Sequence, residues 1–167
     1  MVEPPGRARL NRRLSIPGVE LAVTAFAAWQ SSGLITGWRH APLDRWGWLA
    51  LLVWIAPLPG LVRTGAAGRA LWPFGLSLGI TVVGTLGSLN AACYAGLAIA
   101  LAGWAGAKPA AQRWIWWASS LSWMPVLGWL GKDLGESILP GLRLLLAGAG
   151  TASLLLSRNL RPTPSPP

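Results

Sequence analysis

Charged side chains are scarce in this sequence, and acidic ones are the scarcest. Of 167 residues, 11% are charged, with five Asp or Glu against fourteen Lys or Arg. A soluble domain of ordinary composition carries about 25% charged residues. Hydrophobic residues make up 53% of the chain. The shortage of charge therefore argues against a water-soluble domain and favours a protein that folds in lipid.

Cysteine and histidine each occur once, as Cys93 and His40. A single cysteine excludes a disulfide within the chain and a zinc site built from cysteines. A single histidine argues against a polyhistidine metal site, so we expect no metal and no cofactor. The sequence also lacks a Walker A loop, a GxSxG elbow, an HExxH motif and an EF-hand loop. No acidic residue falls at mid-membrane depth, which leaves a proton relay or a cation-coupled transporter without an obvious carrier.

The stretch from Leu71 to Ala107 is 37 residues long and contains no charged residue. One helical pass through a hydrocarbon layer of about 30 Å needs about 20 residues. The stretch is therefore long enough for two passes. Gly87, Ser88 and Asn90 form the polar or flexible cluster near its middle. We predict a tight transmembrane hairpin whose turn lies at this cluster.

The remaining apolar blocks extend this pattern to an all-α membrane bundle of about six helices. The predicted segments within the membrane domain, residues 17–157, are residues 17–38, 45–62, 71–87, 89–107, 114–130 and 138–157. Residues 1–16 form a basic arm that contains Pro4, Pro5 and Gly6, and residues 158–167 form a tail rich in proline. We expect both ends to be disordered. The apolar block after the basic arm has full length and no convincing cleavage site, so we expect no signal peptide.

The positions of the basic residues predict the sidedness of the bundle. Six passes place ten of them on the side of the termini: Arg7, Arg9, Arg12, Arg13, Arg63, Arg69, Lys108, Arg113, Arg158 and Arg161. Arg39, Arg45 and Lys132 fall on the opposite side. An excess of Lys and Arg marks the cytoplasmic side, so both termini are predicted to be cytoplasmic and the protein to lie in the inner membrane. Because the bases lie between apolar blocks, we expect the bilayer as partner and no nucleic acid.

Small residues recur at positions where membrane helices approach one another. Gly33 and Gly37 form one pair, and Gly75 and Gly79 form another. A ridge of Ala92, Gly96 and Ala100 lies on the segment after the predicted hairpin turn. Lipid provides no hydrophobic drive between helices, so such residues permit close van der Waals packing. We expect all three sets to lie at helix contacts.

Three chemically reactive residues fall on the predicted outer side: Cys93, Arg143 and His40. A thiol needs a nearby base or positive charge to become a nucleophile, and an arginine can stabilise an oxyanion. These residues are therefore the candidate catalytic set. Each also has a simpler interpretation, in which Cys93 is a small packing residue and His40 a solvated interface residue. Arg143 would then reach outward to headgroups or to Asp133 and Glu136.

Several stretches resemble the amino-terminal membrane region of the exosortase/archaeosortase proteins. They are GWRHAPLDRWGWLALLVW, WPFGLSLGITVVGTLGSLNAACYAGLAIALAGW, SLSWMPVLGW and LRLLLAGAG, within about residues 38–150. Members of that family are membrane enzymes that cut and transfer proteins bearing a C-terminal sorting tail, using an outer-face Cys, Arg and His. The family's Ala-Cys-Ser-Gly motif is matched loosely by Ala92-Cys93-Tyr94-Ala95-Gly96, and His40 precedes the cysteine here. The resemblance implies a truncated or non-catalytic relative.

Three functions remain open from the sequence. The first is a small integral membrane protein accessory to surface-protein sorting, with other membrane proteins or sorting-tail substrates as partners. The second is a structural membrane subunit that assembles through its Gly and Ala ridges. The third is an outer-face cysteine transpeptidase or protease that uses Cys93, Arg143 and His40.

Overall fold

The computed structural model describes residues 18–59, 71–105, 110–135 and 137–159, and these contain helices and no strand. The all-α class predicted from the sequence is therefore confirmed for this part of the chain. The α-helices are α2 (Gly18–Gln30), α3 (Gly33–His40), α4 (Gly47–Ile55), α6 (Trp72–Leu86), α7 (Asn90–Gly103), α8 (Ala110–Ala118), α9 (Pro125–Leu130) and α10 (Leu139–Asn159). Short 3-10 turns are η1 (Pro42–Asp44), η2 (Ser119–Ser122) and η3 (Lys132–Leu134). The predicted arm and tail lie outside the described residues, apart from the last turn of α10.

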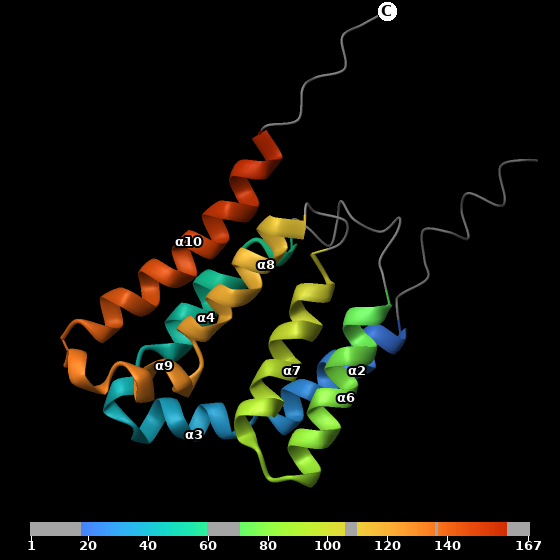
Figure 1. The fold of residues 1–167 in the computed structure, drawn as a ribbon, viewed down its shortest axis with the longest axis horizontal. Helices are drawn as coiled ribbons and strands as arrows, with labels where there is room; N and C mark the ends of the chain where they lie inside the picture. Colours follow the sequence, from blue (N-terminus) through green and yellow to red (C-terminus); the bar gives the residue numbers. More distant parts are fainter. Residues whose placement is uncertain (1–17, 60–70, 106–109, 136, 160–167) are drawn as a thin grey trace, which may run out of the picture.

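The chain runs back and forth between two ends of the molecule (Figure 1). Helix α2 descends in the view of Figure 1, α3 crosses the lower end, and α4 ascends. Helices α6 and α7 then descend and ascend, α8 descends, the short α9 lies at the lower left of the view, and α10 ascends. The start of α2 and the end of α10 consequently lie at the same end of the molecule.

Helices α6 and α7 form an antiparallel hairpin that packs against α2. The turn contains Ser88, whose φ of 54° places it in the left-handed region, and Leu89 N donates to Gly84 O at 2.7 Å. The two helices approach each other most closely where their facing residues are small. A Cβ atom on Gly84 would lie 2.9 Å from Cys93 Sγ and 3.0 Å from Cys93 N. Ser77 Oγ adds a hydrogen bond to Gly96 O at 2.7 Å.

The predicted small-residue contacts are found on α7 and are absent from the predicted pair on α6. Gly96 and Ala100 are buried in α7, as the ridge requires. A Cβ atom on Gly75 or Gly79 would meet no other group within 4 Å. Within the described chain this pair therefore makes no contact with another helix, and its use in contact with another subunit stays a prediction. Gly84, on another face of α6, makes the close approach instead, because α7 packs along that face.

The second group of helices, α4, α8 and α10, encloses a core of tryptophans. Trp54, Trp116 and Trp123 have no exposed surface. The rings of Trp54 and Trp116 stack with centroids 4.3 Å apart, and each indole N–H donates to the other residue's carbonyl, at 2.7 and 3.0 Å. Buried indole N–H groups need such acceptors because water cannot reach them. Tryptophan in membrane proteins commonly lies at the water interfaces, but these three are interior residues.

Two of the predicted membrane segments contain breaks in their helices. Between α2 and α3, Ser31 turns inward and its Oγ donates to Cys93 O at 3.1 Å. Between η2 and α9, Met124 adopts extended angles, with φ −79° and ψ 146°, and Pro125 begins the new helix. Proline disfavours helical angles in the residue before it, so Pro125 explains this second break. The break leaves backbone carbonyls of residues 122–124 outside a regular helix.

We predict that Gly84→Ala destabilises the protein, whereas Gly79→Ala does not. The added methyl at position 84 would meet the backbone and side chain of Cys93, and such overpacking costs about 1–3 kcal/mol. At position 79 the methyl has open space, and alanine improves helix propensity by up to about 1 kcal/mol. Unfolding of the detergent-solubilised protein by denaturing detergent, followed by circular dichroism, measures both. Equal midpoints for the two variants would contradict the packing described for the hairpin.

Candidate functional site

Arg143 lies in the second turn of α10 and is completely buried. Its Nη2 donates to Asp44 Oδ1 in an ion pair. Its Nη1 donates to Ser122 O at 2.7 Å and to Met124 O at 3.1 Å. One guanidinium therefore connects α10, η1 and the break between η2 and α9. Its position is typical of a charge inside an apolar bundle, where it must be paired.

The chain supplies the partners of Arg143 through short and irregular elements. Asp44 is the last residue of η1, a turn initiated by Pro42, and its side chain points inward with the residue 8% exposed. The carbonyls of Ser122 and Met124 are available because the chain leaves the helical path before Pro125. Non-helical backbone in an apolar interior requires donors for its carbonyls. Arg143 provides those donors.

Helix α9 covers the ion pair with a glycine. A Cβ atom on Gly128 would collide with the Asp44 carboxylate and would lie 3.1 Å from Arg143 Nη2. Only a residue without a side chain permits this approach. The backbone of α9 thus lies directly against the pair, of which the Arg143 side chain is 0% and the Asp44 side chain 11% exposed.

Burial determines the electrostatics of Asp44. Desolvation raises the pKa of this carboxyl above its ordinary value, while the charge and the hydrogen bond of Arg143 act in the opposite direction. The carboxylate thus depends on the guanidinium to remain ionised inside the protein. The two groups are a single unit, and neither is tolerable there without the other.

The sequence-based interpretation of Arg143 as a residue that reaches outward is wrong. Its side chain is buried, and its partner is Asp44 rather than the nearby Asp133, which is exposed. Glu136 lies outside the described residues. Asp44 is 99 positions away in sequence, so helical spacing could not identify it. The sequence feature that could have pointed to Asp44 as the partner is its position as a lone acid in the link between the first two predicted segments.

The structure does not bring the three candidate catalytic residues together. Cys93 is 3% exposed on α7, where its sulfur lies 3.9 Å from Thr85 Oγ1 and from Thr81 O. His40 is exposed at the end of α3, and its Nδ1 lies 3.0 Å from Thr36 O of the same helix. Within the described part of the chain, no hydrogen bond or ion pair joins Cys93, His40 and Arg143. The arrangement supports a packing role for Cys93.

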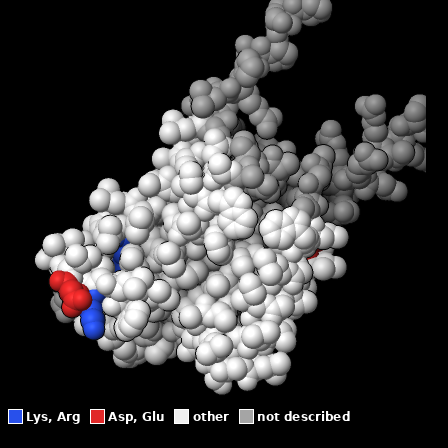
Figure 2. Space-filling model, in the orientation of Figure 1, with Lys and Arg blue, Asp and Glu red and all other residues white. Residues whose placement is uncertain are grey.

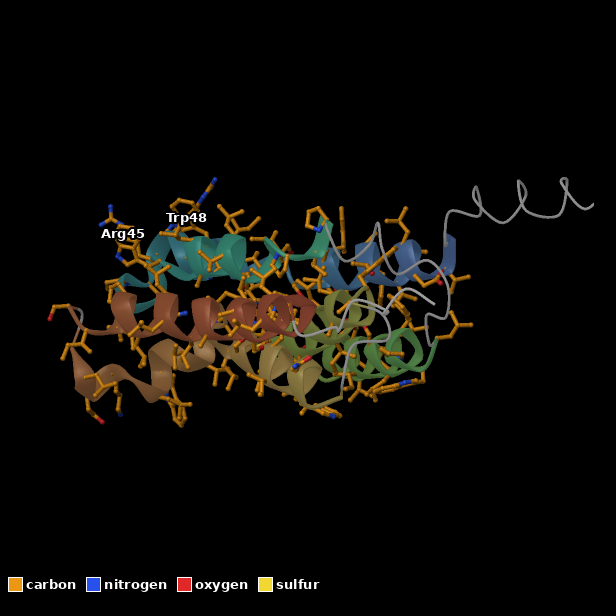
Figure 3. All side chains as sticks on the ribbon, turned by 90° about the horizontal axis from the view of Figure 1, so that it is seen from above. Arg45 and Trp48 are labelled. Atoms are coloured by element: carbon orange, nitrogen blue, oxygen red, sulfur yellow. The ribbon has the colours of Figure 1, made fainter. Side chains whose placement is uncertain are left out.

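A groove of about 360 Å³ opens where α3 turns into α4. Its lining consists of Ile35, Trp38, Arg39, Arg45 and Trp48. The groove is joined to the buried ion pair through the chain, since Arg45 directly follows Asp44. Trp38 Nε1 also donates to Trp123 O at 3.1 Å, so the groove wall contacts the same break that Arg143 stabilises. Figure 3 shows Arg45 and Trp48 projecting outward along one edge of the molecule.

Comparisons with protein-family models, with curated proteins and with solved structures find no match to this chain.

We predict that Asp44→Ala is strongly destabilising and that Asp133→Ala leaves stability unchanged. Removing Asp44 leaves the buried guanidinium without its counter-ion, which costs about 3–5 kcal/mol. Asp133 is an exposed acid in η3, between α9 and α10, and serves as the matched control. Denaturation titrations of both variants in detergent give the comparison. A loss of stability in Asp133→Ala equal to that in Asp44→Ala would contradict the assigned pairing.

Cys93 is predicted to resist thiol reagents in the native protein. Its sulfur is enclosed between α6 and α7, so a maleimide can reach it only after the hairpin opens. Mass spectrometry after timed labelling should show slow modification of the native protein and complete modification after denaturation. Rapid modification of the folded protein would revive the interpretation of Cys93 as a nucleophile.

Proposed function

We propose that this chain is a multi-pass protein of the inner membrane that acts as a structural subunit, without covalent chemistry of its own. In this proposal six segments cross the bilayer and both termini are cytoplasmic. The bilayer is its first partner, and other membrane proteins are the second. The observation that carries the proposal is the surface of α10.

Helix α10 combines an apolar exterior with a charge turned inward. Within the described residues it is the one helix long and apolar enough to cross a membrane, over Leu139–Leu156, and 28% of that window is buried. Leu145 is 72% exposed and Leu156 is 64% exposed, while Arg143 is fully buried. The core helix of a soluble protein would show the opposite distribution. Its 21 residues extend about 31 Å, which matches a hydrocarbon layer of about 30 Å.

The rest of the described surface supports the same environment. Large apolar side chains are exposed on the other helices, including Trp29 at 78%, Val83 at 62% and Leu86 at 82%. Figure 2 shows a face almost free of charged side chains, with charge gathered mainly near α9 and the start of α10. An apolar surface of this extent in water would promote association. In lipid it is the ordinary exterior of a helical protein.

Support for six crossings comes from the path of the chain. Helices α2, α4, α6, α7, α8 and α10 alternate in direction along the chain in the view of Figure 1. Helices α6 and α7 have 15 and 14 residues, so each extends about 21–23 Å and would need its flanking residues to complete a crossing. The ten bases on the side of the termini would then face the cytoplasm.

The resemblance to exosortases gives the proposal a narrower form. In this form the chain is a non-catalytic relative that assists the sorting of surface proteins, and a sorting-tail protein is a further partner. The separate positions of Cys93, His40 and Arg143 support this over the outer-face transpeptidase. Deleting the chain should then impair the processing of surface proteins with a C-terminal sorting tail, and Cys93→Ala should restore it. A deletion without that defect would remove the narrower form and leave the structural subunit.

Reporter fusions in a bacterial host test the topology. We expect a fluorescent protein fused after residue 161 to be active, because the proposed C-terminus is cytoplasmic. Alkaline phosphatase fused after residue 132 should be active, because that link is proposed to lie outside. Fusion after residue 108 is the matched control, since phosphatase there should be inactive. Phosphatase activity at the C-terminus would contradict the six-crossing arrangement.

A further inference from the structure

The groove between α3 and α4 combines two cations with an aromatic wall, and neither cation has a partner among the described residues. Arg39 is the penultimate residue of α3 and Arg45 follows η1, and both are exposed. The ion pair found in the described chain joins Arg143 to Asp44 and involves neither of them. Two guanidinium groups at one hollow of about 360 Å³ create a site for an anion.

The acid nearest to these cations in sequence does not neutralise them. Asp44 lies between Arg39 and Arg45, but its carboxylate points into the interior and is paired with Arg143. Because the Asp44 carboxylate is held inside by Arg143, its negative charge does not lie in the groove. The described rim of the groove carries positive charge alone.

The wall of the groove is held in place by packing. Trp38 donates from Nε1 to Trp123 O at 3.1 Å. A Cβ atom on Gly47 would collide with the Trp38 ring and would lie 3.0 Å from Trp123 O, so the ring sits directly on the backbone of α4. Trp48, one residue further along α4, is 46% exposed and projects beside Arg45 in Figure 3. A rigid aromatic surface next to the cations reduces the entropy lost when a ligand binds.

We propose that this groove binds the headgroup phosphate of an anionic phospholipid. Arg39 and Arg45 donate to the phosphate oxygens, and the acyl chain lies along Trp48 and Ile35. Arginine forks match phosphate geometry, and tryptophan favours the boundary between headgroups and acyl chains. Ile35 is 52% exposed, and a free phosphate would leave this apolar wall in water. An anionic phospholipid therefore accounts for both the arginines and the apolar side chains that line the groove.

Sidedness adds a second argument, which rests on the proposed function. The proposed topology leaves three bases on the outer side, Arg39, Arg45 and Lys132. Two of these three line the groove. Orientation in the membrane favours bases on the cytoplasmic side, so outer bases do not contribute to it. Binding of an outer-leaflet phosphate gives these two arginines a role.

Native mass spectrometry of the full-length protein in mild detergent tests the site. The probes are short-chain phosphatidylglycerol and short-chain phosphatidylcholine, with inorganic phosphate as competitor. We expect phosphatidylglycerol to bind about tenfold more tightly than phosphatidylcholine, because both carry the same phosphate but the quaternary ammonium of phosphatidylcholine is repelled by the two arginines. Arg39→Gln combined with Arg45→Gln should abolish that preference. Inorganic phosphate at millimolar concentration should not displace the lipid.

Lys132→Gln is the matched control, because it removes an exposed cation of η3 that does not line the groove. It should bind both lipids as the original chain does. Trp48→Ala should weaken both lipids alike and preserve the preference for phosphatidylglycerol. The proposal is overturned if Lys132→Gln loses as much affinity as the double variant, or if the two lipids bind equally to the original chain. Displacement by phosphate would instead identify a free anion as the ligand.

The result of the lipid-binding experiment can be distinguished from the result of the reporter fusions that test the topology. Short-chain lipids are soluble as monomers, so their binding does not depend on the direction in which the protein inserts. Correct fusions with no lipid preference would overturn the groove and leave the membrane topology standing. Lipid preference with incorrect fusions would support the groove and contradict the proposed topology.

Discussion

Arg143 and Asp44 form a buried ion pair on which the architecture of one half of the molecule depends. The guanidinium reaches a turn from the first third of the chain and two carbonyls at a helix break. Arg143 Nε has no hydrogen-bond partner among the described residues. Taking these charges out of water costs several kcal/mol each, so the pair is tolerated only when Nη1 and Nη2 of the guanidinium have acceptors. That requirement holds α10, η1 and the start of α9 in one arrangement. Gly128 then allows α9 to close over the pair.

The same pair connects the interior to the surface. Asp44 and Arg45 are consecutive, yet one points into the bundle and the other into the groove. Neutralising Asp44 inside leaves Arg39 and Arg45 as uncompensated cations outside. Trp123, which precedes one of the carbonyls bound by Arg143, accepts the hydrogen bond that positions Trp38. A structural change at the ion pair would therefore be transmitted to the groove in two ways. One is the peptide bond between Asp44 and Arg45, and the other is the hydrogen bond between Trp38 and Trp123.

Glycine and proline have distinct roles in the two halves of the molecule. In the α6–α7 hairpin, Gly84 and Gly96 bring the helices together at distances that a side chain would prevent. In the half that contains α10, Pro125 breaks a helix and frees carbonyls for Arg143. Gly75 and Gly79 share the spacing of a packing motif but face no described neighbour. Spacing alone indicates that close approach is possible, and the path of the neighbouring helix decides whether it occurs.

The sequence by itself determined the helical class and the position of the hairpin turn, and it predicted a lipid environment. These follow from composition and from local periodicity, which each segment carries independently of its neighbours. The tertiary structure decided the partner of Arg143, the inward position of three tryptophans and the separation of Cys93 from His40 and Arg143. It also assembled the groove from two elements joined by a turn. Contacts between residues as distant as Asp44 and Arg143 depend on how helices pack in three dimensions, and no local pattern in one sequence records that.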